Sequence, residues 1–180
     1  TGKVFARMLR NNFVSSVALV FKRQVLFSLD YIYDDRFIAI EDYDLTLRLA
    51  LKYEFDFVDK VLCKRRMGSG DTYKPGFKVM FFKERIDMFE TYEQKYKSSM
   101  DYYRDDVENA KSKIFFHLAL DEWDKGNVKE ARNLLLLYKN YFINIIAYLG
   151  TWIFSSYRSF DYVYRKIVFP IRIKVKYFRY

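Results

Sequence analysis

The chain has very little cysteine, histidine, glycine or proline. Its 180 residues include one cysteine, Cys63, so an internal disulfide framework is excluded, and a single histidine argues against a zinc site built from His and Cys ligands. Six glycines and two prolines leave little material for turns, which favours a helix-rich structure. Because Cys63 lies in an apolar run, we expect it to be a buried, inert thiol.

The remaining composition is that of a globular protein with a basic C-terminal region. Hydrophobic residues make up 51% of the chain, charged residues 31% and aromatic residues 21%. The net charge of +9 is unevenly distributed, because residues 139–180 contain eight basic side chains and one acidic side chain. The positive charge that would attract an anionic partner therefore lies mainly in residues 139–180.

Residues 1–76 alternate between helical and strand-like patterns. Residues 13–21 (FVSSVALVF) are apolar, rich in β-branched side chains and free of charge, which is typical of a buried strand. Residues 54–64 (EFDFVDKVLCK) also resemble a strand. Helical spacing is found over residues 3–10, 22–29 and 42–53. The sequence therefore predicts an α/β (α+β) domain over residues 1–76 with two or more strands.

Residues 77–138 have long helical patterns and predict a helical extension. Within it, residues 114–137 resemble a helical hairpin that is broken at Gly126 and Asn127. Four residues with small or large apolar side chains would interlock across this hairpin: Ala119, Trp123, Ala131 and Leu135.

Two adjacent carboxylates, Glu41 and Asp42, precede the apolar positions of the predicted helix 42–53. An acidic side chain at a helix N-terminus is stabilised as an anion by the helix dipole and the free N–H groups. Many helices carry such acids only as first-turn residues. The alternative is that a carboxylate held rigidly at the floor of a pocket accepts a proton from a substrate.

The order of the motifs around this pair resembles the acceptor half of family 2 glycosyltransferases of the GT-A fold. The resemblance covers roughly residues 4–75, and its densest part is the run EDYDLTLRLALKYEFDFVDKVLCKRR, which starts at Glu41. The residues that carry it are Asn12 to Val17, Phe21 to Arg23, Tyr33 to Asp35, Glu41 to Leu45, Arg48 to Ala50, Phe57, Val58, Leu62, Arg65, Arg66 and Ser69.

The resemblance implies an activity and a site. In that family, an Asp in the Glu-Asp motif deprotonates the acceptor hydroxyl while a nucleotide diphosphate leaves with inversion at the anomeric carbon. The corresponding residue here is Asp42, with Glu41 beside it. The expected function is transfer from a nucleotide sugar to a sugar or lipid-linked acceptor in bacterial surface polysaccharide or glycolipid synthesis, in the cytoplasm at the inner face of the plasma membrane.

The family also has a nucleotide-binding half with a metal-binding Asp-x-Asp motif, which these 180 residues lack. The divalent metal, Mg²⁺ or Mn²⁺, that the resemblance implies would therefore have its ligands outside this chain. Asp42-Tyr43-Asp44 has the Asp-x-Asp spelling, but it coincides with the motif of the catalytic base, so we do not interpret it as the metal site. We expect the chain by itself to be incomplete and inactive.

Four further residues are candidates for substrate binding, and the three arginines among them each have an alternative role. Arg48 is spaced to form an ion pair with Asp44 one helical turn earlier, which would make it structural. Arg65 and Arg66 precede a glycine-rich loop that contains Ser69. The two arginines either lie at a solvated strand end or contact a phosphate of the donor or of a lipid-phosphate acceptor.

Residues 139–180 form an aromatic and basic tail. Between Lys139 and Arg158 lie 18 uncharged residues, a length at the lower limit for a membrane-spanning helix. The alternatives are a helix packed on the protein's own core and a segment lying on an anionic membrane surface, and we favour the membrane surface. We do not expect nucleic acid binding, because no nucleic-acid motif accompanies the tail.

Two functions follow for the whole chain. The leading one is an inverting glycosyltransferase with residues 1–76 as its acceptor side. The alternative is a non-catalytic helical interaction module that uses residues 101–137 and the basic tail to bind a protein partner or a membrane surface.

Overall fold

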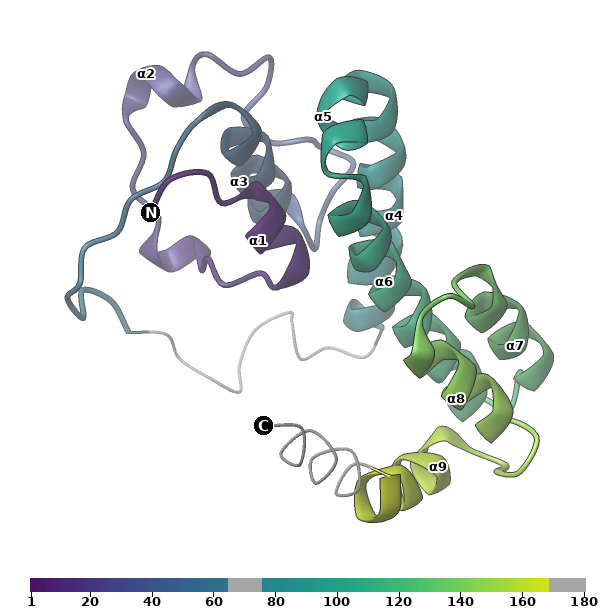
Figure 1. Ribbon diagram of the computed structural model, residues 1–180. Coiled ribbons are helices and arrows are strands. Elements are labelled where there is room, and N and C mark those ends of the chain that lie inside the picture. The colour runs from purple at the N-terminus through teal and green to yellow at the C-terminus, as the bar shows by residue number, and fades with distance from the viewer. Residues whose placement is uncertain (65–75, 169–180) are drawn as a thin grey trace, which may run out of the picture. The chain divides into compact units, whose positions relative to one another are not determined.

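The computed structural model describes residues 1–64 and 76–168, and the side chains up to residue 166. Helices make up most of the described residues (Figure 1). In chain order the elements are α1 (Phe5–Arg10), the 3-10 helix η1 (Ser16–Ala18), α2 (Arg23–Leu26), α3 (Glu41–Lys52), α4 (Phe77–Lys95), α5 (Lys97–Tyr102), α6 (Arg104–Asp124), α7 (Val128–Leu137), α8 (Phe142–Gly150), α9 (Tyr157–Val163) and the π-helix η3 (Tyr164–Val168).

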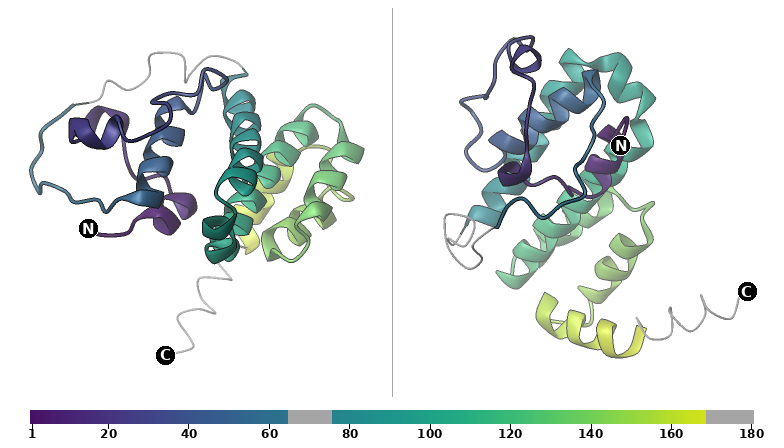
Figure 2. Two further views of the ribbon diagram at one scale, coloured as in Figure 1. Left: turned by 90° about the horizontal axis from the view of Figure 1, so that it is seen from above. Right: turned by 90° about the vertical axis from the view of Figure 1, so that its left-hand side faces the viewer.

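The expected α/β fold is wrong for the part of the chain that the structure describes, which is all-α. Its β pairing consists of an isolated antiparallel bridge between Gly2 and Phe55, and neither residues 13–21 nor residues 54–64 form a strand (Figure 2). Val20, in the segment predicted to be a buried strand, is 95% exposed, and Val61, in the other predicted strand, is 93% exposed. A strand forms only where a neighbour accepts and donates its backbone hydrogen bonds, and beyond the Gly2–Phe55 bridge no described segment does so here.

The prediction for Cys63 is wrong for the same reason, because its side chain is exposed. The helical predictions for the N-terminal region are confirmed more closely. Helix α3 begins within one residue of the predicted start, and α1 and α2 fall inside the predicted ranges. The glycine-rich loop predicted to follow Arg66, residues 67–76, lies outside the described residues except for Gly76.

The chain divides into two compact units, residues 1–111 and residues 112–180, with the boundary inside α6. Unit 1 is organised around α3, in which every residue from Tyr43 to Ala50 is buried. Helix α1 packs against α3 and contributes the buried side chains of Phe5, Met8 and Leu9 (Figures 1 and 2). Because the body of α3 is buried and packs against α1, the first turn of α3 is held in place.

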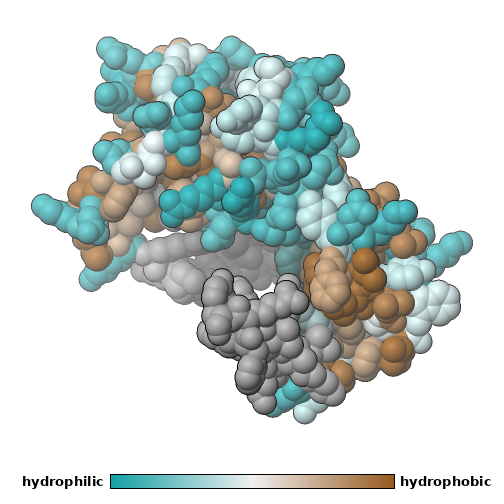
Figure 3. All heavy atoms as spheres, in the orientation of Figure 1, coloured by the Kyte–Doolittle hydropathy of each residue, from teal (hydrophilic) through white to brown (hydrophobic). Residues whose placement is uncertain are grey.

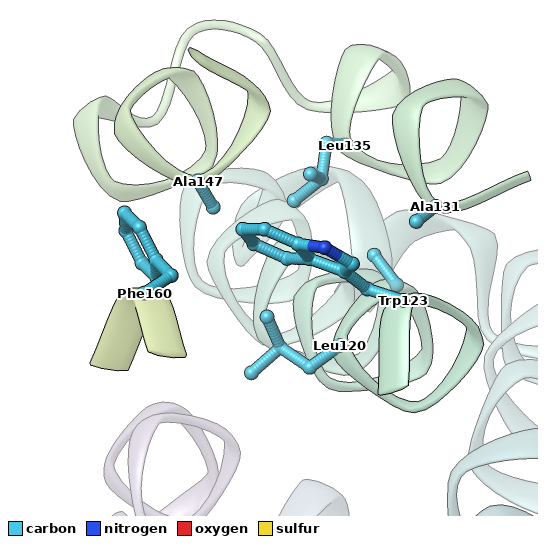
Figure 4. Close-up of a cluster of buried hydrophobic side chains, with 7 residues drawn as sticks. Leu120, Trp123, Ala131, Leu135, Ala147 and Phe160 are labelled. Atoms are coloured by element: carbon cyan, nitrogen blue, oxygen red, sulfur yellow. The ribbon is translucent and has the colours of Figure 1, made fainter. Parts of the chain in front are cut away.

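Unit 2 contains the predicted helical hairpin. Trp123 is fully buried and its ring lies among side chains from α6, α7, α8 and α9 (Figure 4). The four residues predicted to interlock all belong to this cluster, whose members are Ala119, Leu120, Trp123, Ala131, Leu135, Ala147 and Phe160. The prediction of the hairpin and its core is thus confirmed. Gly126 ends the first helix with a φ of 87°, a left-handed conformation that glycine adopts without steric cost.

The uncharged segment between Lys139 and Arg158 forms α8 and a turn that leads to α9. Within the described ranges, no helix combines the length and the apolar character needed to cross a bilayer. Of the alternatives for the tail, the membrane-spanning helix is therefore not supported by these residues.

Candidate functional site at the start of helix α3

Glu41 and Asp42 occupy the first turn of α3, as the sequence predicts. Ile40 precedes them as the N-cap residue and contributes no side-chain hydrogen bond. Both acidic side chains are partly exposed, and neither carboxylate forms a hydrogen bond or an ion pair with another described residue. The pair is therefore accessible, and within the described part of the chain its charge is not neutralised by a basic side chain.

Glu84 of α4 holds the backbone that leads into this turn. Its carboxylate accepts hydrogen bonds from the N–H of Ile38, at 3.1 Å, and from the N–H of Ala39, at 2.8 Å. Glu84 is itself buried. Hydrogen bonds to a charged acceptor are stronger than those between neutral groups, so this contact restrains the two residues before Ile40.

A buried ion pair fixes the next turn of α3. The guanidinium of Arg48 lies 2.9 Å from the carboxylate of Asp44, and the side chains are 2% and 1% exposed. Tyr92 of α4 donates its hydroxyl to the same carboxylate at 2.9 Å. Arg48 also donates to the carbonyl oxygens of Tyr31 and Ile32, each at 2.6 Å. This network connects α3 to α4 and to the loop that precedes α3.

Burial sets the protonation behaviour of this network. Burial raises the pKa of Asp44, while the charge and hydrogen bond of Arg48 and the hydrogen bond from Tyr92 oppose that rise. Burial also raises the pKa of Tyr92 well above its usual value, and the neighbouring Asp44 carboxylate adds to the effect. Tyr92 therefore remains a hydrogen-bond donor across the physiological pH range.

Asp42-Tyr43-Asp44 does not fit a metal ion, although its spelling matches a metal-binding motif. Asp44 is buried and its oxygens already accept from Arg48 and Tyr92, which leaves Asp42 without a second carboxylate on this motif. Among residues 1–64 and 76–168, no three His, Cys, Asp or Glu side chains cluster so that they could hold a metal ion.

The predicted substrate-binding residues have different outcomes. The predicted ion pair between Asp44 and Arg48 is confirmed, and the guanidinium of Arg48 is enclosed by the fold. Arg65, Arg66 and Ser69 lie outside the described residues. A hollow of about 380 Å³ in unit 1 is lined by residues of α4, α5 and α6, and Asp42 is not among them.

Sequence reasoning missed Glu84 and Tyr92, which position the start of α3. Both lie in the long helical pattern of residues 77–96, more than 40 positions from their partners. Nothing local in the sequence distinguishes Glu84 from the exposed acids of the same helix.

Comparison with protein families, with curated proteins and with solved structures found no match to the chain.

Proposed function

We propose that the chain is the acceptor-side part of an inverting glycosyltransferase in which Asp42 is the general base. The observation that carries the proposal is the partly exposed Asp42 carboxylate, which has no hydrogen-bond or ion-pair partner among the described residues. It extends from a helix turn that is restrained on both sides. A carboxylate in this position is available to an alcohol that approaches the start of α3.

The chemistry assigned to Asp42 is proton transfer. The acceptor oxygen forms a bond to the anomeric carbon of the donor as the bond from that carbon to the nucleotide diphosphate breaks. The hydroxyl proton passes to the Asp42 carboxylate, and the leaving diphosphate takes the bonding electrons. Glu41 lies beside Asp42 and is the second candidate for the base. Mg²⁺ or Mn²⁺ is not assigned a step, because Asp42 and Asp44 do not form a ligand set.

Rigidity of the helix start supports this proposal. A catalytic base must be held within hydrogen-bond distance of the group that it deprotonates, and small displacements reduce the rate strongly. Glu84 restrains the backbone before Asp42, and the Asp44–Arg48–Tyr92 network restrains the turn after it. The resemblance of residues 4–75 to family 2 glycosyltransferases supplies the reaction class, and the α/β fold that this resemblance implied is not part of the proposal.

The proposed location is the cytoplasmic face of a membrane, with a sugar or lipid-linked acceptor and a role in bacterial surface polysaccharide or glycolipid synthesis. Residues 139–180 would provide peripheral contact, because they carry eight basic side chains and one acidic side chain.

The test is sugar transfer by the complete gene product with a panel of nucleotide sugars, comparing the wild type with Asp42→Asn. We expect the amide to reduce turnover by roughly 10²- to 10⁴-fold, the usual contribution of a general base, with an unchanged thermal unfolding transition. Asp87→Asn is the matched control, because Asp87 is an exposed acid of α4 that lies outside the residues that carry the resemblance. Full turnover in Asp42→Asn, or no transfer by the wild type with any donor, would contradict the proposal.

A helical interaction module remains the second candidate. It is favoured by the all-helical character of the described residues and by apolar side chains that are exposed on unit 2. A scaffold would retain partner binding in Asp42→Asn and would show no turnover in either form, so the same pair of proteins separates the two functions.

A further inference from the structure

Helix α8 is apolar on two opposite faces, only one of which is covered. Ala147 and Gly150 face the core cluster around Trp123, together with the buried Asn144. Ile145 and Leu149, four residues apart, lie together on the other face, and both side chains are exposed. A helix that contacts water on one side normally carries polar residues there.

The uncovered face continues past the end of α8. We define the α8 face as Ile145, Leu149, Trp152 and Ile153, whose side chains are between 43% and 77% exposed. Hydrophobic side chains gather over the region of α7 and α8 in the space-filling view (Figure 3). A contiguous apolar surface of this kind marks a site of contact with another apolar surface.

Basic side chains flank the α8 face in the sequence. Lys139 and Arg158 stand at the two ends of the 18 uncharged residues that contain it, and both side chains are exposed. Residues 139–180 as a whole carry eight basic side chains and one acidic side chain. An apolar surface flanked by basic side chains complements an anionic bilayer, in which phosphate groups lie above the acyl chains.

Trp152 and Arg132 are arranged in a way that suits the boundary between headgroups and acyl chains. The Arg132 guanidinium lies 3.6 Å from the centre of the Trp152 ring and donates hydrogen bonds to the side-chain and main-chain oxygens of Thr151. The ring is 65% exposed. Tryptophan is enriched at this depth in membranes, and a stacked arginine can reach phosphate oxygens beside it.

We propose that the α8 face docks on an anionic lipid bilayer, with α8 lying in the plane of the surface. No described helix has the length and apolar character to cross the bilayer, so the contact is interfacial. The excess of positive charge in residues 139–180 favours the bilayer over a second copy of the chain, because two copies would bring like charges together. The inference deepens the peripheral location proposed above and does not depend on Asp42.

The test is cosedimentation of the chain with vesicles of phosphatidylcholine alone and of phosphatidylcholine with 30% phosphatidylglycerol, at roughly 0.1 M salt. We expect binding to the anionic vesicles, and a loss of roughly tenfold or more in Ile145→Ser/Leu149→Ser. Val20→Ser/Val61→Ser is the matched control, because it removes two exposed aliphatic side chains from unit 1. This control should bind as the wild type does.

Tryptophan fluorescence gives a second measurement that does not require the variants to bind. Trp123 is fully buried and Trp152 is exposed, so a blue shift on adding anionic vesicles reports Trp152. Trp152→Phe should abolish the shift. If Ile145→Ser/Leu149→Ser fails to fold, the wild type and Trp152→Phe still decide the outcome.

Four results would overturn the proposal. Undiminished vesicle binding in Ile145→Ser/Leu149→Ser, or no blue shift on binding, would mean that the basic residues alone hold the chain on the surface. Equal binding to neutral and to anionic vesicles would show that the basic side chains do not contribute to binding. A dimer in analytical ultracentrifugation that Ile145→Ser/Leu149→Ser dissociates would assign the face to a second copy. Vesicle binding is measured without donor or acceptor, so a failed transfer assay does not affect it.

Discussion

The carboxylate of Asp44 lies 2.9 Å from the guanidinium of Arg48, one helical turn later, and both side chains are almost completely withdrawn from solvent. A pair of this kind is costly to bring out of water and more costly to break, because the remaining charge is buried without its partner. Arg48 also satisfies the carbonyl oxygens of Tyr31 and Ile32. The loop before α3 and the helix itself therefore depend on one side chain.

Replacement of Arg48 by Met should lower the free energy of unfolding by about 3–5 kcal/mol, because Asp44 loses its charged partner. Urea denaturation measures this change. In Arg48→Met/Asp44→Asn the loss should be smaller than the sum of the two single losses, because no unpaired charge remains. Arg165→Met is the control, since it breaks an exposed ion pair of the same i,i+4 spacing, with Asp161, and should change stability little. Simple additivity would contradict the coupling.

Glu84 should determine how firmly the start of α3 is held. In Glu84→Ala the N–H groups of Ile38 and Ala39 lose their charged acceptor, which should cost about 1.5–3 kcal/mol. Hydrogen exchange of these two amides should accelerate more than exchange within α3. Glu90→Ala changes an exposed acid of the same helix and should alter neither quantity. Protected amides at Ile38 and Ala39 in Glu84→Ala would show that the carboxylate is dispensable.

The helical parts of the chain were predictable because their information is local. The spacing of Ala119, Trp123, Ala131 and Leu135 identifies the faces of two helices that meet, and the structure confirms that core. The location of the Glu41–Asp42 pair in the first turn of a helix was also predictable from the local sequence pattern. Its supports do not, because Glu84 and Tyr92 act across more than 40 residues.

The strand predictions failed because an apolar run of strand length does not specify a partner. Residues 13–21 have the composition of a buried strand and residues 54–64 resemble a strand, yet Val20 and Val61 are almost fully exposed. A strand requires a neighbouring backbone, and the sequence pattern of one segment contains no information about whether that neighbour exists. In the described residues the pairing extends no further than Gly2 and Phe55.

Gly150 should be intolerant of even one added methyl group. A Cβ at this position would lie 2.5 Å from the Phe160 ring and 3.2 Å from Trp123, so α8 or α9 would have to move. We expect Gly150→Ala to lower the free energy of unfolding by about 1–3 kcal/mol, although alanine favours helix. In Gly150→Ala/Phe160→Leu the loss should be smaller than the sum of the single losses. Gly126→Ala is the control, because its added Cβ strains a left-handed backbone conformation but lies in open space. The loss of stability in Gly126→Ala/Phe160→Leu should equal the sum of the two single losses.

Tyr157 should make the stability of unit 2 depend on pH in the alkaline range. Burial, together with the charge and the hydrogen bond of Asp161, raises the pKa of Tyr157 to about 12, whereas an unfolded tyrosine has a pKa of about 10. Between these values the folded protein holds a proton that the unfolded chain has lost. The contribution of Tyr157 is therefore fully present below pH 10 and is lost as the pH rises toward 12.

The comparison that isolates this effect is the wild type against Tyr157→Phe, since other buried tyrosines titrate equally in both proteins. The difference in unfolding free energy should be constant up to about pH 9 and should shrink above it, because phenylalanine has no proton to lose. Asp161→Asn should shift the titration of Tyr157 toward its ordinary range, since it removes the charge that opposes tyrosinate formation. A difference that stays constant to pH 12 would show that Tyr157 titrates as it does in the unfolded chain.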